Sequence, residues 1–172
     1  RRGETERAIR MHQNLVGRDD LPQDLKLQAL AELGQDYLKA GLLDRAEEIF
    51  DKLRDSDLAE DAKRNLLEIY QLEKDWEKAI AIASELPDFA SHREIAEYYC
   101  ELAAAEIMRS RRDLATVYLQ TAFERNRKCV RASLLLGDIQ FQQDQLLAAI
   151  ETWQRIEQQD PPYLALVAQR LL

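Results

Sequence analysis

The sequence predicts an all-α protein built from repeated pairs of antiparallel helices. Ala, Leu, Glu, Gln, Arg and Lys, all good helix formers, dominate the 172 residues, and only five residues are Gly and four are Pro. Apolar residues make up 46% of the chain, which is enough to supply a core. A pattern of small and aromatic residues also returns along the chain at intervals close to 34 residues.

The clearest copy of this pattern is LGQDYLKAGLLDRAEEIF, residues 33–50. Its key residues follow the spacing L-G-x-x-Y and A-x-x-x-F of the tetratricopeptide repeat (TPR), in which helix A, a turn and helix B form one unit. These residues are Leu33, Gly34, Tyr37, Ala46 and Phe50. We expect Gly34 and Ala46 to permit a close approach of the paired helices. Gly41 is expected to form the turn, because only Gly adopts a positive φ at little cost.

The other copies follow in order. In RRGETERAIRMHQNL, Gly3 and Ala8 take the places of Gly41 and Ala46, so this stretch matches helix B alone. The next copies place Tyr70 with Ala79, then Ala103 with Ala115, and then Gly137 with Ala149, Trp153 and a following Pro161. The helix B alanines at 8, 46, 79, 115 and 149 are 38, 33, 36 and 34 residues apart by subtraction. The two longer intervals indicate insertions, GRDDLPQDL in the first connection and LPDFASH in the third.

These copies predict a single TPR array, cut from a longer one. Residues 1–21 form helix B of a truncated repeat, 22–57, 58–91, 92–127 and 128–160 form complete repeats, and 161–172 form helix A of a truncated repeat. The expected helices span 5–16, 22–39, 43–54, 58–72, 76–86, 92–108, 112–125, 129–142, 146–157 and 161–172. Stacked repeats of this kind form a right-handed superhelix whose concave face is built from the A helices. The half-repeats at the two ends could pair with another chain, which would make the fragment self-associate.

Charge and composition exclude several classes of function. The net charge of −8 repels phosphate backbones, so nucleic acid is not expected as a partner. No run of 18 apolar residues is present, so we expect no contact of this fragment with the membrane interior. The two cysteines, Cys100 and Cys129, are not in a CxxC motif, and we expect two reduced thiols in a cytoplasmic protein.

No catalytic, cofactor-binding or metal-binding residue is predicted. His12 and His92 are the only histidines, and no nucleotide loop, nucleophile elbow or Cys–His pair accompanies them. His12 occupies the position of Phe50 on its helix, so partial burial is its expected state. The sequence therefore favours a protein that is not an enzyme.

The amino-acid sequence of the repeats is more specific than a general TPR pattern. RRGETERAIRMHQNL, LGQDYLKAGLLDRAEEIF and REIAEYYCELA together resemble the TPR region of the lipopolysaccharide assembly protein B family (LapB, also called YciM), and the resemblance runs from Arg1 to Leu172. It implies a non-enzymatic adaptor of Gram-negative bacteria that regulates lipopolysaccharide synthesis by promoting FtsH-dependent degradation of the deacetylase LpxC. Family members carry an N-terminal membrane helix and a C-terminal rubredoxin-like metal module. Neither is recognised in these 172 residues, so the resemblance implies a position on the cytoplasmic face of the inner membrane through an anchor outside them.

The concave face is the expected protein-binding surface. In TPR arrays a few fixed positions of helix A point inward, and here carboxylates outnumber cations at those positions. The candidate contact residues are Asn65, Glu68, Glu97, Glu101, Met108, Asp138 and Phe141. Carboxylates beside apolar side chains predict a partner segment with basic and apolar residues. By resemblance, the candidate partners are LpxC, FtsH or a regulatory membrane protein of the pathway.

Two alternatives stay open. The chain could be a TPR scaffold of another bacterial pathway, or an accessory domain of a larger enzyme or metal protein whose activity lies elsewhere. The convex face also competes with the concave face, because TPR arrays bind partners on both.

Overall fold

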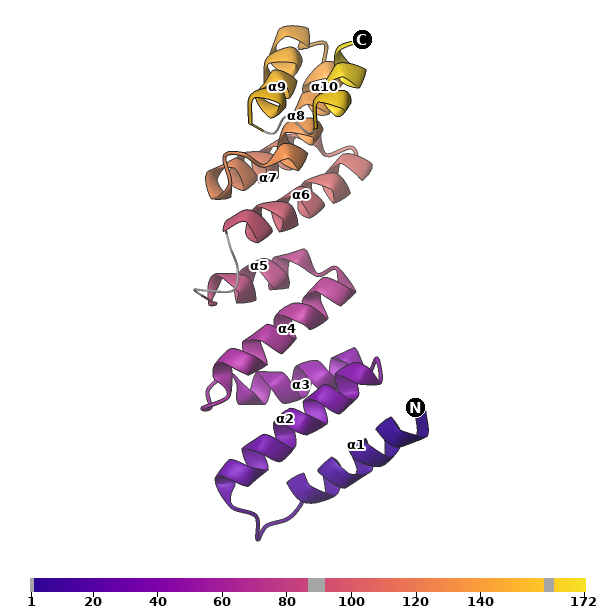
Figure 1. Ribbon diagram of the computed structural model, residues 1–172, viewed down its shortest axis with the longest axis vertical. Coiled ribbons are helices and arrows are strands. Elements are labelled where there is room, and N and C mark those ends of the chain that lie inside the picture. The colour runs from indigo at the N-terminus through magenta and orange to yellow at the C-terminus, as the bar shows by residue number, and fades with distance from the viewer. Residues whose placement is uncertain (1, 87–91, 160–162) are drawn as a thin grey trace. The chain divides into compact units, whose positions relative to one another are not determined.

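The computed structural model describes residues 2–86, 92–159 and 163–172, and the regular structure in these ranges is α-helical (Figure 1). The described residues form α1 (Arg2–Val16), α2 (Gln23–Lys39), α3 (Leu43–Leu53), α4 (Ala59–Glu73), α5 (Trp76–Ser84), α6 (His92–Met108), α7 (Arg112–Arg125), α8 (Val130–Gln142), α9 (Leu146–Gln159) and α10 (Leu164–Leu171). The all-α prediction is confirmed, and the expected helix ends lie within three residues of these bounds. Most of the insertion at 86–92, together with Pro161, lies outside the described residues.

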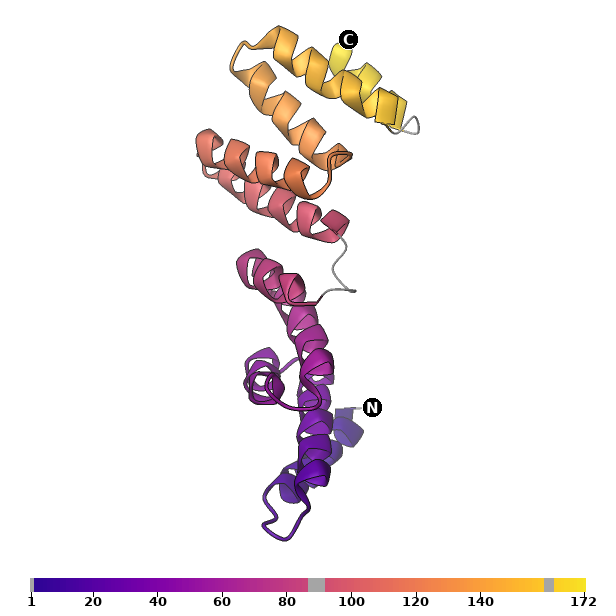
Figure 2. The same cartoon turned by 90° about the vertical axis from the view of Figure 1, so that its left-hand side faces the viewer.

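The chain divides into two compact units, residues 1–86 and residues 87–172. In the first unit, each of the helices α1 to α4 packs on the next helix along the chain. In the second unit, α6 and α7 form one antiparallel pair and α8 and α9 form another, with α8 also packing on α6 and α7, and α10 packing on α9 (Figure 2). Helices α2, α4, α6, α8 and α10 take the place of helix A, and the others that of helix B. No helix of the described ranges is both long and apolar enough to cross a membrane.

Alanine at the predicted helix B position marks the centre of each helix pair. Ala46, Ala79, Ala115 and Ala149 have no exposed surface, as the repeat pattern predicts. The preceding equivalent, Ala8, is half-buried. The side chain of His12 is also only partly buried, as expected, and its Nδ1 lies 2.7 Å from Asp36 Oδ2 on α2.

Glycine in helix A makes room for an aromatic ring from helix B. A Cβ added at Gly34 would lie 2.8 Å from Phe50 Cζ, and one added at Gly137 would lie 2.1 Å from Trp153 Nε1. The equivalent positions of the two middle repeats hold Leu67 with Ala83, and Ala103 with Leu119, and all four residues are buried. In the first of these pairs the larger residue is on helix A. In the second, Ala on helix A faces a Leu of intermediate size on helix B. Side-chain volume is thus balanced at this point of every pair, which keeps the interior close-packed.

The turn between helix A and helix B has one backbone conformation in all four complete pairs. Gly41, Lys74, Ser110 and Asp144 each have φ between 60° and 73°, the left-handed region. The amide of the following residue donates back to the fifth carbonyl before it, as Leu42 N does to Tyr37 O at 2.9 Å. The same bond recurs from Asp75 to Tyr70, Arg111 to Glu106 and Gln145 to Gln140. This is the Schellman arrangement that ends many helices.

The predicted equivalence of Gly3 with Gly41 is not seen. Gly3 lies inside α1, which begins three residues earlier than expected, whereas Gly41 alone among the glycines of the described ranges has a positive φ.

Candidate protein-binding grooves

A groove of about 380 Å³ lies between α2 and α4 of the first unit, and we call it the α2–α4 groove. It is lined by Ala31, Glu32, Gln35, Phe50, Leu53, Leu58, Asp61, Ala62, Arg64 and Asn65. Gln35 donates from Nε2 to Asn65 Oδ1, and Asn65 Nδ2 donates to the backbone carbonyl of Asp61 at 2.7 Å. Amide groups held in this way present fixed hydrogen-bonding atoms beside the carboxylates of Glu32 and Asp61.

A second groove, of about 500 Å³, lies beside α6 and α8 of the second unit, and we call it the α6–α8 groove. It is lined by Arg93, Glu97, Asn126, Lys128, Cys129, Val130, Arg131, Leu134 and Tyr163. Three of these side chains are cationic and one is a carboxylate. The excess of carboxylates that the sequence predicts for the inner face therefore does not extend to this groove.

Arg93 and Lys128 are functional candidates that the sequence reasoning missed. The register of inward positions excludes both, because Lys128 precedes α8 and Arg93 lies in the first turn of α6. The spacing of Arg93 and Glu97 carried a usable signal, since residues four apart share one face of a helix.

Arg131 forms ion pairs with two of the predicted contact residues. Its Nη1 lies 2.6 Å from Glu101 Oε1 and 3.9 Å from Glu97 Oε2. The hydrogen bond to Glu101 raises the pKa of Arg131 above its ordinary value, against the opposing effect of burial. Arg131 is therefore positively charged at any physiological pH, and it ties α6 to α8.

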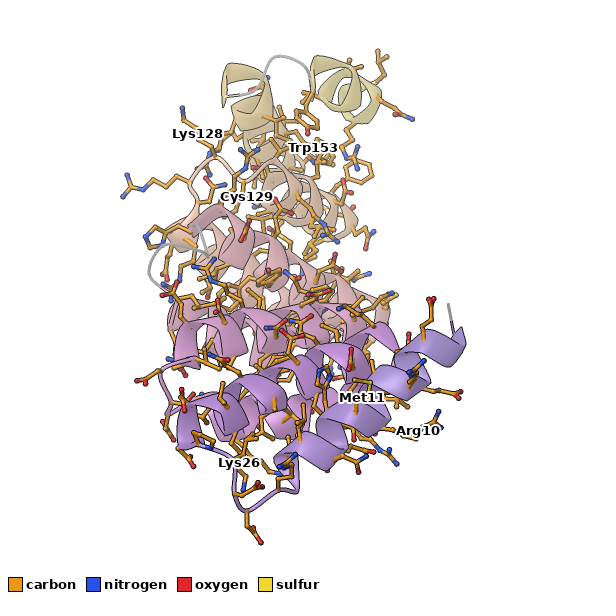
Figure 3. All side chains as sticks on the ribbon, turned by 60° about the horizontal axis from the view of Figure 1, so that its bottom comes forward. Arg10, Met11, Lys26, Lys128, Cys129 and Trp153 are labelled. Atoms are coloured by element: carbon orange, nitrogen blue, oxygen red, sulfur yellow. The ribbon has the colours of Figure 1, made fainter. Side chains whose placement is uncertain are left out.

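Cys129 brings a thiol to the edge of the same groove. It is the N-cap residue of α8, next to Lys128 where the chain enters that helix (Figure 3). Its Sγ lies 3.7 Å from Cys100 Sγ on α6 and 3.6 Å from Glu97 Oε1. The hydrogen bond with Cys100 lowers the pKa of the Cys129 thiol, and the backbone N–H of Ala132 acts in the same direction. The positive end of the α8 dipole also favours a thiolate at this place.

The remaining predicted residues of the second unit lie away from the groove lining. Asp138 accepts hydrogen bonds from Arg170 Nε at 2.8 Å and from Nη2 at 3.1 Å, which joins α8 to α10. The Phe141 ring is half-exposed and its centroid lies 5.9 Å from that of Trp153. Met108, the last residue of α6, is 82% exposed.

The structure thus distributes the seven predicted contacts among several places. Asn65 lines the α2–α4 groove, and Glu68 is an exposed residue of the same helix, α4. Glu97 lines the α6–α8 groove, and Glu101 reaches it through Arg131. Asp138, Phe141 and Met108 are separate points on α8 and the end of α6.

Paired antiparallel helices, left-handed A–B turns and grooves beside the A helices define a helical-repeat protein of the TPR class. The tetratricopeptide repeat family matches residues 31–93 and 101–163, and the chain belongs to that family. Crystal structures of MamA share the fold, with TM-scores of 0.50 and 0.51 at 17% sequence identity; each covers 95% of this chain, and this chain covers 92% and 86% of them.

Among curated proteins, the chain is similar to lipopolysaccharide assembly protein B. It is 37% identical to the protein of Escherichia coli K12 over 163 residues, which is 92% of this chain. It is 36% identical to the protein of Haemophilus influenzae over 166 residues, which is 94% of this chain. In both cases the match spans 42% of the relative's length. The resemblance stated from the sequence is confirmed at this level.

Proposed function

We propose that the chain is a non-enzymatic scaffold that controls lipopolysaccharide synthesis by holding proteins of that pathway together. The observation that carries this proposal is the 36–37% identity to lipopolysaccharide assembly protein B over more than nine-tenths of the chain. A TPR fold with lined grooves in each unit supports a binding role. The proposed partners are LpxC, FtsH or a regulatory membrane protein, and the proposed place is the cytoplasmic side of the inner membrane.

In the first unit, we propose that the α2–α4 groove and the adjoining Glu68 take a segment with basic and apolar residues. Asn65 and Gln35 supply the hydrogen bonds, while Asp61 and Glu68 supply the charge. Charges of this kind steer encounter and choose between partners more than they add affinity.

In the second unit, the ion pairs change what the predicted contacts offer. Glu101 and Asp138 are already joined to arginines, so Met108 and Phe141 contribute exposed apolar surface rather than support for an acidic site. Glu97 and Glu101 stay in the proposal as residues that fix the position of Arg131. A partner segment here meets a mixed surface in which Arg93 and Lys128 carry the positive charge, since Arg131 is paired with Glu101 and Glu97.

Capture of purified LpxC and of the soluble part of FtsH by the chain tests this proposal. Two neutral double variants separate the units: Asp61→Asn with Glu68→Gln in the first unit, and Arg93→Gln with Lys128→Gln in the second unit. Asp113→Asn with Glu124→Gln, on α7, is the matched control. Exposed ion pairs contribute about 0.2–1 kcal/mol each, so loss of two contacts weakens capture about 2- to 30-fold.

We expect one candidate to be captured by the unaltered chain and by the α7 control, and to be captured less by at least one groove variant. If neither candidate is captured by the folded chain, LpxC and FtsH are not its direct partners. If a candidate is captured equally by every variant, the pathway assignment survives but the grooves are not the binding sites.

A further inference from the structure

Glu97, Cys100 and Cys129 meet in the second unit although they come from two helices. In the described ranges they are the group of three His, Cys, Asp or Glu residues whose ligand atoms all lie within 4.8 Å of one another. Cys100 and Glu97 lie one turn apart on α6, and Cys129 is at the start of α8. Both thiols are almost fully buried, whereas Glu97 is partly exposed.

Two of the three distances between these atoms match the edges of a tetrahedral zinc site, and the third, from Cys100 Sγ to the Glu97 carboxylate, is within 4.8 Å. With Zn–S bonds of about 2.3 Å, two sulfur ligands lie about 3.8 Å apart. With a Zn–O bond of about 2.0–2.2 Å, a sulfur and an oxygen ligand lie about 3.5–3.7 Å apart. The sulfur–sulfur distance here is 3.7 Å, and the distance from Cys129 Sγ to Glu97 Oε1 is 3.6 Å.

The surroundings of the three side chains favour such a site. The two carboxylate oxygens of Glu97 face different partners. Oε1 faces Cys129 Sγ, and Oε2 lies 3.9 Å from Arg131 Nη1. Arg131 in turn is fixed by Glu101 at 2.6 Å. Metal-binding carboxylates are commonly oriented by partners of this kind. Glu97 and Cys129 also border the α6–α8 groove, which gives an ion a path to the thiols and leaves room for a further ligand.

We propose that Glu97, Cys100 and Cys129 form a three-ligand Zn²⁺ site whose fourth position faces the α6–α8 groove. Binding deprotonates both thiols, and the two protons pass to solvent. The ion then crosslinks α6 to the start of α8, which belong to neighbouring repeats. Water or a side chain of a bound partner completes the tetrahedron.

Titration of the reduced chain with Co²⁺ under anaerobic conditions tests the site, because tetrahedral Co²⁺ bound to thiolates absorbs strongly in the near ultraviolet and visible. We expect one Co²⁺ per chain with these bands, and their loss when Zn²⁺ is added. Cys129→Ser should abolish the bands while keeping the fold, since Ser is a favoured N-cap residue. Cys100→Ala should do the same.

The carboxylate has its own test with a matched control on α7. Glu97→Gln should weaken Zn²⁺ binding about 10-fold or more, whereas Glu124→Gln should not change it. Zn²⁺ should also raise the melting temperature of the unaltered chain and not that of Cys129→Ser, since a ligand that binds only the folded state stabilises it. Co²⁺ binding that is equal in the chain and in Cys129→Ser, or Zn²⁺ affinity unaffected by Glu97→Gln, would overturn the site.

Discussion

At the scale of single residues, the balance of volume across each helix pair decides which substitutions the repeats tolerate. Gly137 faces the indole of Trp153, and Gly34 faces the ring of Phe50. The third repeat solves the same packing problem with Ala103 opposite Leu119 in the equivalent positions. A change on one helix should therefore be compensated by a change on the other.

Gly137→Ala should destabilise the second unit more than Gly34→Ala destabilises the first. Ala is favoured over Gly inside a helix by about 1 kcal/mol, whereas overpacking costs about 1–3 kcal/mol. At Gly34 the new Cβ lies 2.8 Å from the edge of the buried Phe50 ring, so overpacking outweighs the gain in helix propensity by the smaller margin. At Gly137 it lies 2.1 Å from Trp153, so overpacking dominates. Urea unfolding of the two variants measures the difference.

A double-mutant cycle with Trp153→Leu checks the reason for this effect. Gly137→Ala with Trp153→Leu reproduces the Ala–Leu pair of the third repeat, and its loss of stability should be smaller than the sum of the two single losses by about 1 kcal/mol or more. Additive losses would show that Gly137 and Trp153 do not share one packing site.

At the scale of elements, the turn between helix A and helix B requires one residue in the left-handed backbone conformation. Among the four complete pairs, only one has glycine at that position. Lys74, Ser110 and Asp144 adopt the same conformation as Gly41 with φ near 60°. The left-handed conformation costs a residue with a Cβ roughly 1–2 kcal/mol, and less for Asp, whose side chain bonds locally.

Lys74→Gly and Ser110→Gly should each stabilise the chain by up to about 1 kcal/mol, since glycine removes the backbone strain but has more freedom to lose on folding. Asp144→Gly should gain less. Gly41→Ala, the opposite change, should destabilise the chain by about 1 kcal/mol. Thermal unfolding of the four variants gives the ranking, and a lower midpoint for Lys74→Gly would contradict it.

The positions of the helices and the faces they bury could largely be predicted from the sequence, because the repeat pattern reflects local helix geometry. The spacing of the helix B alanines located the helices, and the aromatic residues at Phe50 and Trp153 marked the faces they bury. The turns at Lys74 and Ser110 carried no glycine, so their left-handed conformation follows from the repeat register and not from residue type. The analogy of Gly3 with Gly41 misplaces the start of α1 by three residues, because Gly3 lies inside the helix and not in a turn.

The candidate site was less predictable, because it depends on pairs of side chains from neighbouring repeats. Arg131 and Arg170 come from the next helix A in the array and neutralise Glu101 and Asp138. A prediction that considers the inward positions of one helix at a time treats those carboxylates as free to bind a partner. Cys100 and Cys129 are likewise 29 residues apart in sequence, and no local motif predicts that their sulfur atoms lie 3.7 Å apart.

At the scale of the whole molecule, the two units carry grooves of different charge. The α2–α4 groove has Glu32 and Asp61 with Arg64, whereas the α6–α8 groove has three cations with Glu97. Under the proposed binding role, partner segments of different charge would therefore select between the units even though the repeats share one fold. Salt should weaken both interactions, because exposed charges are screened within about 8–10 Å at physiological ionic strength.

Hydrogen exchange of the chain with and without a captured partner tests most directly whether the grooves are the working surface. Buried contacts slow exchange of the amides they cover, and the helices on either side of each groove report separately. We expect slowed exchange in α2 and α4, or in α6 and the start of α8, with α7 and α9 unchanged. Slowed exchange confined to α3, α7 and α9 would show that partners bind the B helices, and would contradict a role for the grooves.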